Sequence, residues 1–118
     1  MANEILIKNY LAGAAIAARR IVKFDTTDGT VIQAAAAADL SVGVCGEVGP
    51  ASGERCDVIH QGIAEVDFGG TVARGAMVTA DANGKAVAAA STNRTIGIAL
   101  VSAVSGDIAP VLIAPSVM

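Results

Sequence analysis

Apolar and polar side chains alternate along short stretches of this chain. Residues 62–68 (GIAEVDF) show the pattern most clearly, since alanine, valine and phenylalanine alternate with glutamate and aspartate. A period of two predicts a strand with one face toward solvent. Turn signals recur every eight to twelve residues or so, with β-branched runs between them, which predicts roughly nine or ten short strands. The pattern is therefore typical of an all-β protein, a compact β-barrel or sandwich of short antiparallel strands.

The turns between these strands are rich in glycine. Asn83-Gly84 lies between Met77–Ala80 and Ala86–Val87, and it is a two-residue hairpin signal because both residues tolerate positive φ. Asp28-Gly29 has the same place earlier in the chain. The segments GPASGE (49–54) and SAVSGD (102–107) form a second matched pair of turns.

These matched turns belong to a longer repetition of the sequence. Residues 20–59 and 76–113 share one order of aliphatic residues, turn acids and glycines. The matched pairs include Val22 with Val78, 56 positions apart, Gly29 with Gly84, 55 apart, and Gly53 with Gly106, 53 apart. Repetition of scaffold residues predicts a fold made of duplicated strands. We expect a single β domain over 16–118, built from two pseudo-repeats of about 55 residues at about 16–60 and 72–114.

Residues 1–15 precede the first repeat and form a predicted N-terminal arm. Ile5, Leu6 and Ile7 stand in a row, followed by Tyr10 and Leu11. A strand that is apolar on both faces is either a central strand or one lent to a neighbouring molecule. The arm is therefore the predicted extended contact segment.

Three segments fit the strand pattern less well. The alanines at 34–38 favour a helix, but five residues are too few to nucleate one alone, so a single helical turn is the alternative to a loop there. Residues 11–20 are compatible with a short helix, although their position favours an extended lead-in. Pro110 and Pro115 predict that the last strand lies at an edge or stops there.

Composition narrows the possible functions. The chain has 118 residues, of which 53% are hydrophobic and 3% aromatic, and its net charge is −3. An acidic chain without a basic cluster disfavours nucleic-acid binding, and so few aromatics argue against a stacking platform. The longest uncharged stretch, Thr95–Gly106, has 12 residues, which argues against a membrane span of ~20. The N-terminus lacks the features of a signal peptide, so we expect synthesis in a cytoplasm.

No arrangement of residues points to catalysis, a cofactor or a metal site. His60 is the single histidine, and we interpret it as a polar residue at a strand end. No zinc-ligand spacing is present. The acidic pairs Glu65/Asp67 and Asp25/Asp28 are typical of a solvated strand face and a turn. We therefore expect a protein that is not an enzyme.

Cys45 and Cys56 form a candidate cross-strand pair. If 49–54 is a tight turn between antiparallel strands, residues whose numbers add to 101 lie opposite one another, which places Cys45 against Cys56. A disulfide is one interpretation. In a cytoplasm the thiols stay reduced, so we favour two small buried apolar side chains.

The order of these blocks resembles the small capsid decoration, or cement, proteins of tailed bacteriophages, of the Mu-like and long-tailed phage type. The resemblance covers nearly the whole chain. Its residues are EILIKNYLAGAAIAARRIVKF (4–24), VGV (42–44), the block from SGERCDVI through ADANGKAVAA (52–89), and IGIALVSAVSGDIAPVLI (96–113).

The resemblance implies a non-enzymatic structural virion protein on the outer surface of the phage head, assembled in the host cytoplasm. Members of this family sit as homotrimers and clamp neighbouring major capsid protein subunits after the head expands. For this chain we expect the capsid or inter-subunit contact at Ile5, Leu6, Ile7, Tyr10 and Leu11 of the arm, adding a strand to a capsid edge or swapping between subunits.

Two alternatives remain open at this point. One is a β-barrel carrier or ligand-binding module of a larger complex. A carrier needs a modifiable lysine at a hairpin tip, and Lys85 is the candidate, but the flanking methionine of a biotinyl-type site is missing. The other is a structural protein of a tail or another phage particle part.

Overall fold

The computed structural model describes residues 3–39, 41–91 and 93–117, which form nine strands and no helix. The strands are β1 (Asn3–Ala12), β2 (Ile21–Phe24), β3 (Thr30–Gln33), β4 (Ser41–Cys45), β5 (Arg55–Asp67), β6 (Met77–Ala80), β7 (Ala86–Ala88), β8 (Arg94–Ala99) and β9 (Ile108–Val117). The predicted all-β class is confirmed. The described part of the chain offers no helix of the length and apolarity that a membrane crossing needs.

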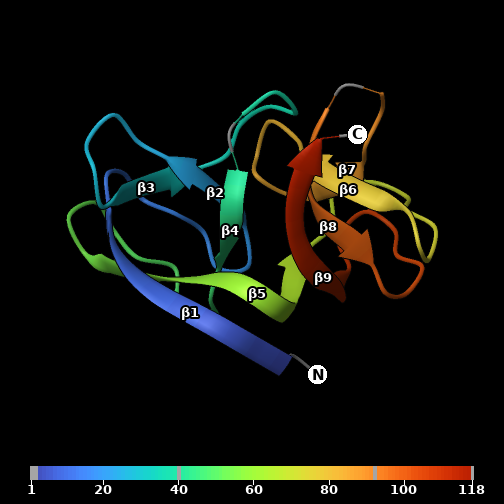
Figure 1. Cartoon of the computed structure of the whole chain (residues 1–118), viewed down its shortest axis with the longest axis horizontal. Helices are drawn as coiled ribbons and strands as arrows, with labels where there is room; N and C mark the ends of the chain where they lie inside the picture. The colour runs from blue at the N-terminus through green and yellow to red at the C-terminus, as the bar shows by residue number, and fades with distance from the viewer. Residues whose placement is uncertain (1–2, 40, 92, 118) are drawn as a thin grey trace.

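Five strands close a barrel in the first half of the chain, residues 3–61. Their order is β1-β3-β2-β4-β5, and β5 pairs back with β1 (Figure 1). The β1–β5 ladder is long and antiparallel, from Asn3 opposite Ile63 to Leu11 opposite Arg55. The β1–β3 ladder is parallel and short, which differs from the purely antiparallel pairing expected. Only the last two residues of β1, Leu11 and Ala12, pair with β3.

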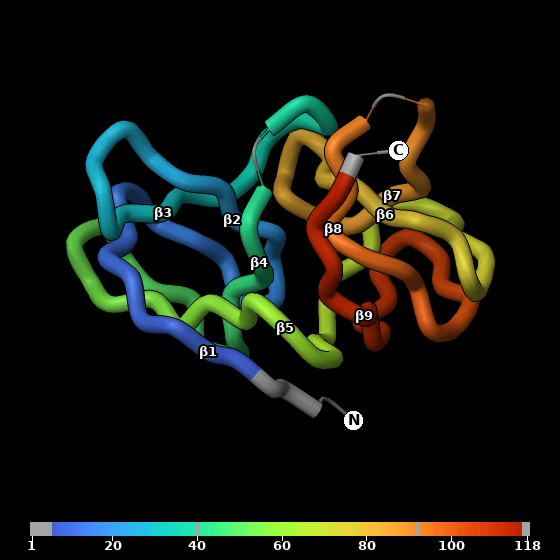
Figure 2. The backbone as a smooth tube through the Cα atoms, viewed as in Figure 1, coloured from blue at the N-terminus to red at the C-terminus, as the bar shows by residue number. Residues whose placement is uncertain are grey.

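The second half, residues 62–117, repeats this order of pairing. The strands continue as β5-β9-β8-β6-β7, and a parallel bridge joins Phe68, just after β5, to Ala86 of β7. Figure 2 shows the chain completing the first half, blue to green, before it builds the second, yellow to red. The long strand β5 belongs to both halves.

Backbone hydrogen bonds recur at matching places in the two halves. The matched donor–acceptor pairs are Ala12 N to Glu54 O with Phe68 N to Asp107 O, Gly13 N to Val31 O with Gly69 N to Ala86 O, and Ile16 N to Pro50 O with Val72 N to Ala103 O. The duplication of the sequence stays a prediction, and these contacts support it. In the second half, the end of β5 takes the place in the ladder that β1 has in the first.

Gly62 lies where β5 passes from one half to the other. Its φ is 99°, a backbone conformation that glycine adopts without strain and other residues avoid. It pairs with Glu4 on one side and with Ile113 on the other. This kink lets one strand of 13 residues serve both halves.

Each half has its own buried core. The first half encloses Tyr10, Ala12, Ile16, Val22, Val31, Cys45, Cys56 and Val58. The second encloses a larger set that includes Val66, Phe68, Val72, Val78, Ile96 and Val111. Four apolar side chains of the first half belong to the second cluster, namely Ile21, Ala34, Val44 and Ile59. They lie on the outside of the first barrel, so the second half packs against that face.

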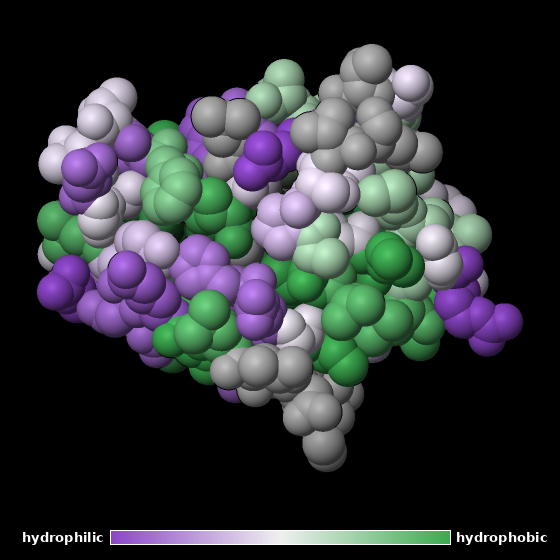
Figure 3. Space-filling view, viewed as in Figure 1, coloured by the Kyte–Doolittle hydropathy of each residue, from purple (hydrophilic) through white to green (hydrophobic). Residues whose placement is uncertain are grey.

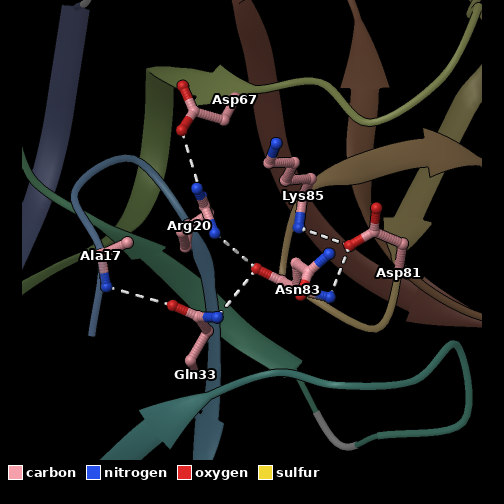
Figure 4. Close-up of polar contacts among 7 residues, drawn as sticks. All are labelled: Ala17, Arg20, Gln33, Asp67, Asp81, Asn83 and Lys85. Carbon is pink, nitrogen blue, oxygen red and sulfur yellow. Dashed lines mark hydrogen bonds and ion pairs between the residues drawn. The ribbon is translucent and has the colours of Figure 1, made fainter. Parts of the chain in front are cut away.

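Polar contacts fix the two halves to each other beside this apolar face (Figure 4). Arg20 Nε lies 3.1 Å from Asp67 Oδ2, and Arg20 Nη1 donates to Asn83 O at 2.8 Å. Gln33 Nε2 donates to the same carbonyl oxygen at 2.8 Å. Asp81 holds this turn by accepting hydrogen bonds from the backbone N–H groups of Asn83 and Lys85. The β6–β7 turn is thereby seated on β2 and β3.

The alanines at 34–38 form no helical turn. Asp39 Oδ2 accepts hydrogen bonds from Ala35 N at 2.8 Å and Ala36 N at 3.0 Å, and so closes a short turn. A side chain that binds backbone N–H groups competes with helix formation. The described residues at 13–20 are also without helix, as the extended lead-in predicts.

The prediction that proline places the last strand at an edge is wrong. β9 contains Pro110 and Pro115 and pairs with both β5 and β8. The carbonyl of Pro110 points toward β8, and Pro110 has no N–H to offer on that side. Because β8 ends at Ala99, the ladder loses little there. Pro115 lies at the irregularity between Thr95 and Gly97, where a proline is tolerated.

The β6–β7 connection is longer than the predicted two-residue hairpin. Ala80 pairs with Ala86, and Asp81 N donates to Lys85 O at 2.9 Å, so five residues make the loop. Gly84 has a φ of 73°, whereas Asn83 has no positive φ. The Asp81 side chain stabilises this wider turn and replaces the type I′ geometry.

Candidate interaction surface

Strand β1 presents an unpaired edge along most of its length. One edge of β1 pairs with β5 from Asn3 to Leu11. The other edge, called the outer edge, pairs with β3 only at Leu11 and Ala12. In the part of the chain that the structure describes, no strand covers the outer edge between Asn3 and Tyr10. Free N–H and C=O groups on such an edge are a template for another strand.

Exposed aliphatic side chains lie on this strand. The exposed fractions are 47% for Leu6, 51% for Ile7 and 39% for Leu11. Two irregularities, between Glu4 and Leu6 and between Leu6 and Ile7, break the usual alternation, so both neighbours face solvent. The backbone of Ile5 belongs to β1, and its side chain lies outside the described residues. The predicted contact residues 6, 7 and 11 are therefore available to a partner.

Tyr10 differs from the other predicted contact residues because its side chain is 7% exposed. Its Oη lies 2.8 Å from His60 Nε2, and its ring contacts Phe24 edge-on, with centroids 6.1 Å apart. Lys8 Nζ lies 5.5 Å from the centre of the ring. Tyr10 therefore fastens β1 to the barrel and offers little surface to a partner.

His60 is a structural residue inside β5, and not at the strand end that the sequence predicts. Its Nδ1 lies 3.0 Å from the carbonyl oxygen of Val42, which can only accept, so Nδ1 carries the hydrogen. An imidazole that donates through Nδ1 alone accepts at Nε2, and the Tyr10 hydroxyl lies there as the donor. Both ring nitrogens are occupied, and His60 links β1, β4 and β5. Sequence reasoning missed this bond because its partners lie 50 positions apart.

Cys45 and Cys56 are buried, free and adjacent, with their sulfurs 3.7 Å apart. The predicted register is wrong, however, since Cys45 pairs with Val58 and Val44 with Ile59. The contact between the two thiols is diagonal. Hydrogen bonding to Cys56 and burial raise the pKa of the Cys45 thiol, which keeps it protonated. This agrees with two small buried side chains.

The described residues bring together no cluster of histidine, cysteine and carboxylate side chains able to hold a metal ion. A polar hollow beside β1 is lined by Asn9, Gly46, Glu47, Val48, Arg55 and Asp57. Two of these residues, Asn9 and Asp57, are directly paired on β1 and β5, and Asn9 Nδ2 donates to Asp57 Oδ1 at 3.0 Å. Lys85, on which the carrier alternative depends, is the last residue of the β6–β7 loop and is half-buried.

Comparison with solved structures shows the same fold in a phage protein. The crystal structure of the head fiber gp8.5 N base in bacteriophage phi29 matches with a TM-score of 0.71 and 18% sequence identity. The match covers 96% of this chain and 97% of that one. No curated protein sequence matches.

A structural match at 18% identity shows the fold alone, so the family of this chain is assigned from a family model. The model described as phage cement protein matches residues 3–113, which is nearly the whole chain. The expected resemblance to capsid decoration proteins is thereby confirmed. The chain belongs to the phage cement protein family and is a structural protein of the phage particle.

Proposed function

We propose that this protein binds the outer surface of the phage head and joins neighbouring major capsid protein subunits. In this role it stabilises the expanded shell against the outward pressure of packed DNA. The observation that carries the proposal is the open edge of β1 with its exposed Leu6 and Ile7. The protein acts as a homotrimer, assembled in the host cytoplasm and carried on the outside of the virion.

The edge of β1 gives two sources of affinity at once. Its free N–H and C=O groups add a strand to a capsid sheet, and the flanking side chains enter apolar pockets. Leu6 and Ile7 are each about half exposed. Burying the remaining half of each contributes about 1 kcal/mol per side chain.

A contact of this strength becomes effective through repetition. A trimer presents three β1 edges to adjoining capsid subunits, and each bound edge raises the effective concentration of the others. The acidic charge of −3 also suits a surface that never meets the packaged DNA. Tyr10 and His60 keep the strand in place, so little ordering cost remains on binding.

The test compares two variants in binding to purified expanded heads. Leu6→Asp/Ile7→Asp puts charges on the proposed contact, and Val48→Asp puts one on an exposed valine, 82% accessible, in the β4–β5 loop. We expect the double variant to remain in the supernatant when heads are sedimented, while Val48→Asp sediments with them. If the double variant binds heads as well as the wild type, the proposed contact is wrong.

A further inference from the structure

A row of partly exposed apolar side chains crosses the second half of the molecule. Met77 pairs with Ile98, Ile98 with Leu112, and Leu112 with Ile63, so the row runs over β6, β8, β9 and β5. Directly paired residues place their side chains on the same face of a sheet. Leu112 is 40% exposed and the other three are partly buried. Figure 3 shows hydrophobic side chains gathered over β9 and the strands beside it.

The first half contains the same row at the same place in its ladders. Ile21 pairs with Val44, Val44 with Ile59, and Ile59 with Ile7, over β2, β4, β5 and β1. The difference is burial. Ile21 and Val44 are 0% exposed and Ile59 is 5% exposed. The first row is covered for most of its length, whereas the second is open.

The cover of the first row is the second half of the same chain. Ile21, Val44 and Ile59 belong to the core cluster of the second half, and β4 contacts β8 and β9. The β6–β7 turn closes the contact, because Ile21 N donates to Gly84 O at 2.8 Å. Arg94 N adds a hydrogen bond to Ala37 O at 3.1 Å. One half of this fold thus buries the outer row of another.

We infer that the open row Met77–Ile98–Leu112–Ile63 is covered by the first half of a second copy of this chain. The first half carries the matching turn, since Gly29 between β2 and β3 has a φ of 77° and Gly84 between β6 and β7 has 73°. The Asp28-Gly29 turn of one copy then seats beside Met77 of the next, as Asn83-Gly84 seats beside Ile21 within the chain. The inference rests on the proposed self-association and names its surface.

The contact is head-to-tail, since the surfaces of the two partners differ. Repetition of such a contact closes a ring or extends a filament, and a closed ring agrees with the proposed homotrimer. A continuous apolar row across four strands is also the kind of surface that a monomer seldom leaves open. The β1 edge stays outside this contact, so a ring leaves it free for the shell.

The first test uses mass in solution, measured by light scattering. Leu112→Asp places a charge in the centre of the row, and Val104→Asp places one on a 52% exposed valine in the β8–β9 turn of the same half. We expect Leu112→Asp to be monomeric and Val104→Asp to keep the wild-type mass. Circular dichroism and thermal unfolding establish that both variants are folded. A folded Leu112→Asp protein with the wild-type mass overturns the inference.

The second test fixes the direction of the contact by cross-linking. Arg20 reaches the β6–β7 turn within the chain, and Ala76 is the matching residue before β6. We expect a short thiol-reactive cross-linker to join copies of the Asp28→Cys/Ala76→Cys variant, and to leave the wild type and each single variant unlinked, since Cys45 and Cys56 are buried. A Leu112→Cys variant that links to itself would indicate two copies facing each other with the same row, and would refute the head-to-tail arrangement.

The two proposals fail in distinguishable ways. If Leu6→Asp/Ile7→Asp keeps the wild-type mass but binds no heads, the shell contact stands and is separate from self-association, while the mass of Leu112→Asp decides the row. If the wild type binds heads as a monomer, the row and the homotrimer are wrong and the shell contact remains.

Discussion

Replacing Tyr10 with phenylalanine tests how β1 is held on the barrel. The substitution removes one oxygen atom and keeps a buried ring that is 7% exposed, so packing is preserved. The lost bond is the 2.8 Å contact from Tyr10 Oη to His60 Nε2. His60 cannot turn to another partner without giving up its bond to Val42 O. The variant therefore leaves His60 Nε2, a partly buried acceptor, without its hydrogen-bond donor.

The expected cost is about 1–3 kcal/mol in the free energy of unfolding, the range for a buried group left without a hydrogen bond. Tyr10→Ala also removes the ring from the core and from its edge contact with Phe24, so it should cost about 3–5 kcal/mol. The difference between the two variants separates the hydrogen bond from the packing. Tyr10→Phe should leave β1 paired with β5, and Tyr10→Ala should release β1 from the barrel.

Urea unfolding followed by circular dichroism is the appropriate assay. Tyr10 is the chain's single tyrosine and there is no tryptophan, so fluorescence would lose its probe in the variant. Protein concentration is held fixed, because self-association adds to apparent stability. A double-mutant cycle with His60→Leu, which has no hydrogen-bonding group in its side chain, isolates the pair. A Tyr10→Phe loss below about 0.3 kcal/mol, or equal losses in both backgrounds, would refute the role assigned to the bond.

Three further predictions follow from other contacts. The Asp39 carboxylate is partly desolvated, but hydrogen bonds from Ala35 and Lys23 and the Lys23 charge hold its pKa below the ordinary 3.8. The stabilising contribution of the Asp39 carboxylate is therefore complete above its ordinary pKa and is lost as the pH falls through the lower pKa of the folded state. The difference in the free energy of unfolding between wild type and Asp39→Asn, measured by urea titration, should narrow in acid. Gly97→Ala should yield little folded protein in a solubility assay, because a Cβ there would overlap Leu112 O. Cys45 and Cys56 should resist a thiol reagent until urea unfolds the chain, since both are buried.

Local patterns in the sequence are sufficient to predict the strands and turns. Period-two alternation identified the end of β5, and glycines marked the turns at Gly29, Gly53, Gly84 and Gly106, each with positive φ. These features depend on neighbours in sequence. A strand's inner face and a glycine's freedom are set by a few residues on either side, so they can be predicted without the fold.

Register and burial could not be predicted this way. The sequence predicts a tight turn for the β4–β5 connection, but Pro50 O accepts a hydrogen bond from Ile16 N, so the loop is held by the lead-in to β2. The ladder shifts by two residues as a result, with Cys45 opposite Val58. The sequence predicts Tyr10 as a contact residue because its partner, His60, is distant in sequence. In both cases a long-range contact decided the outcome.

The kink at Gly62 has a mechanical consequence for the proposed role, in which the protein resists tension. Any pull that separates the two halves is transmitted along the covalent backbone of β5, which is continuous through both. The flanking ladders with β1 and β9 meet β5 at the same residue, Gly62, from opposite sides. They would have to slide along β5, with many hydrogen bonds loaded together, and could not unzip one bond at a time. A shell joined through β1 would thus transmit its strain into the strongest direction of the fold.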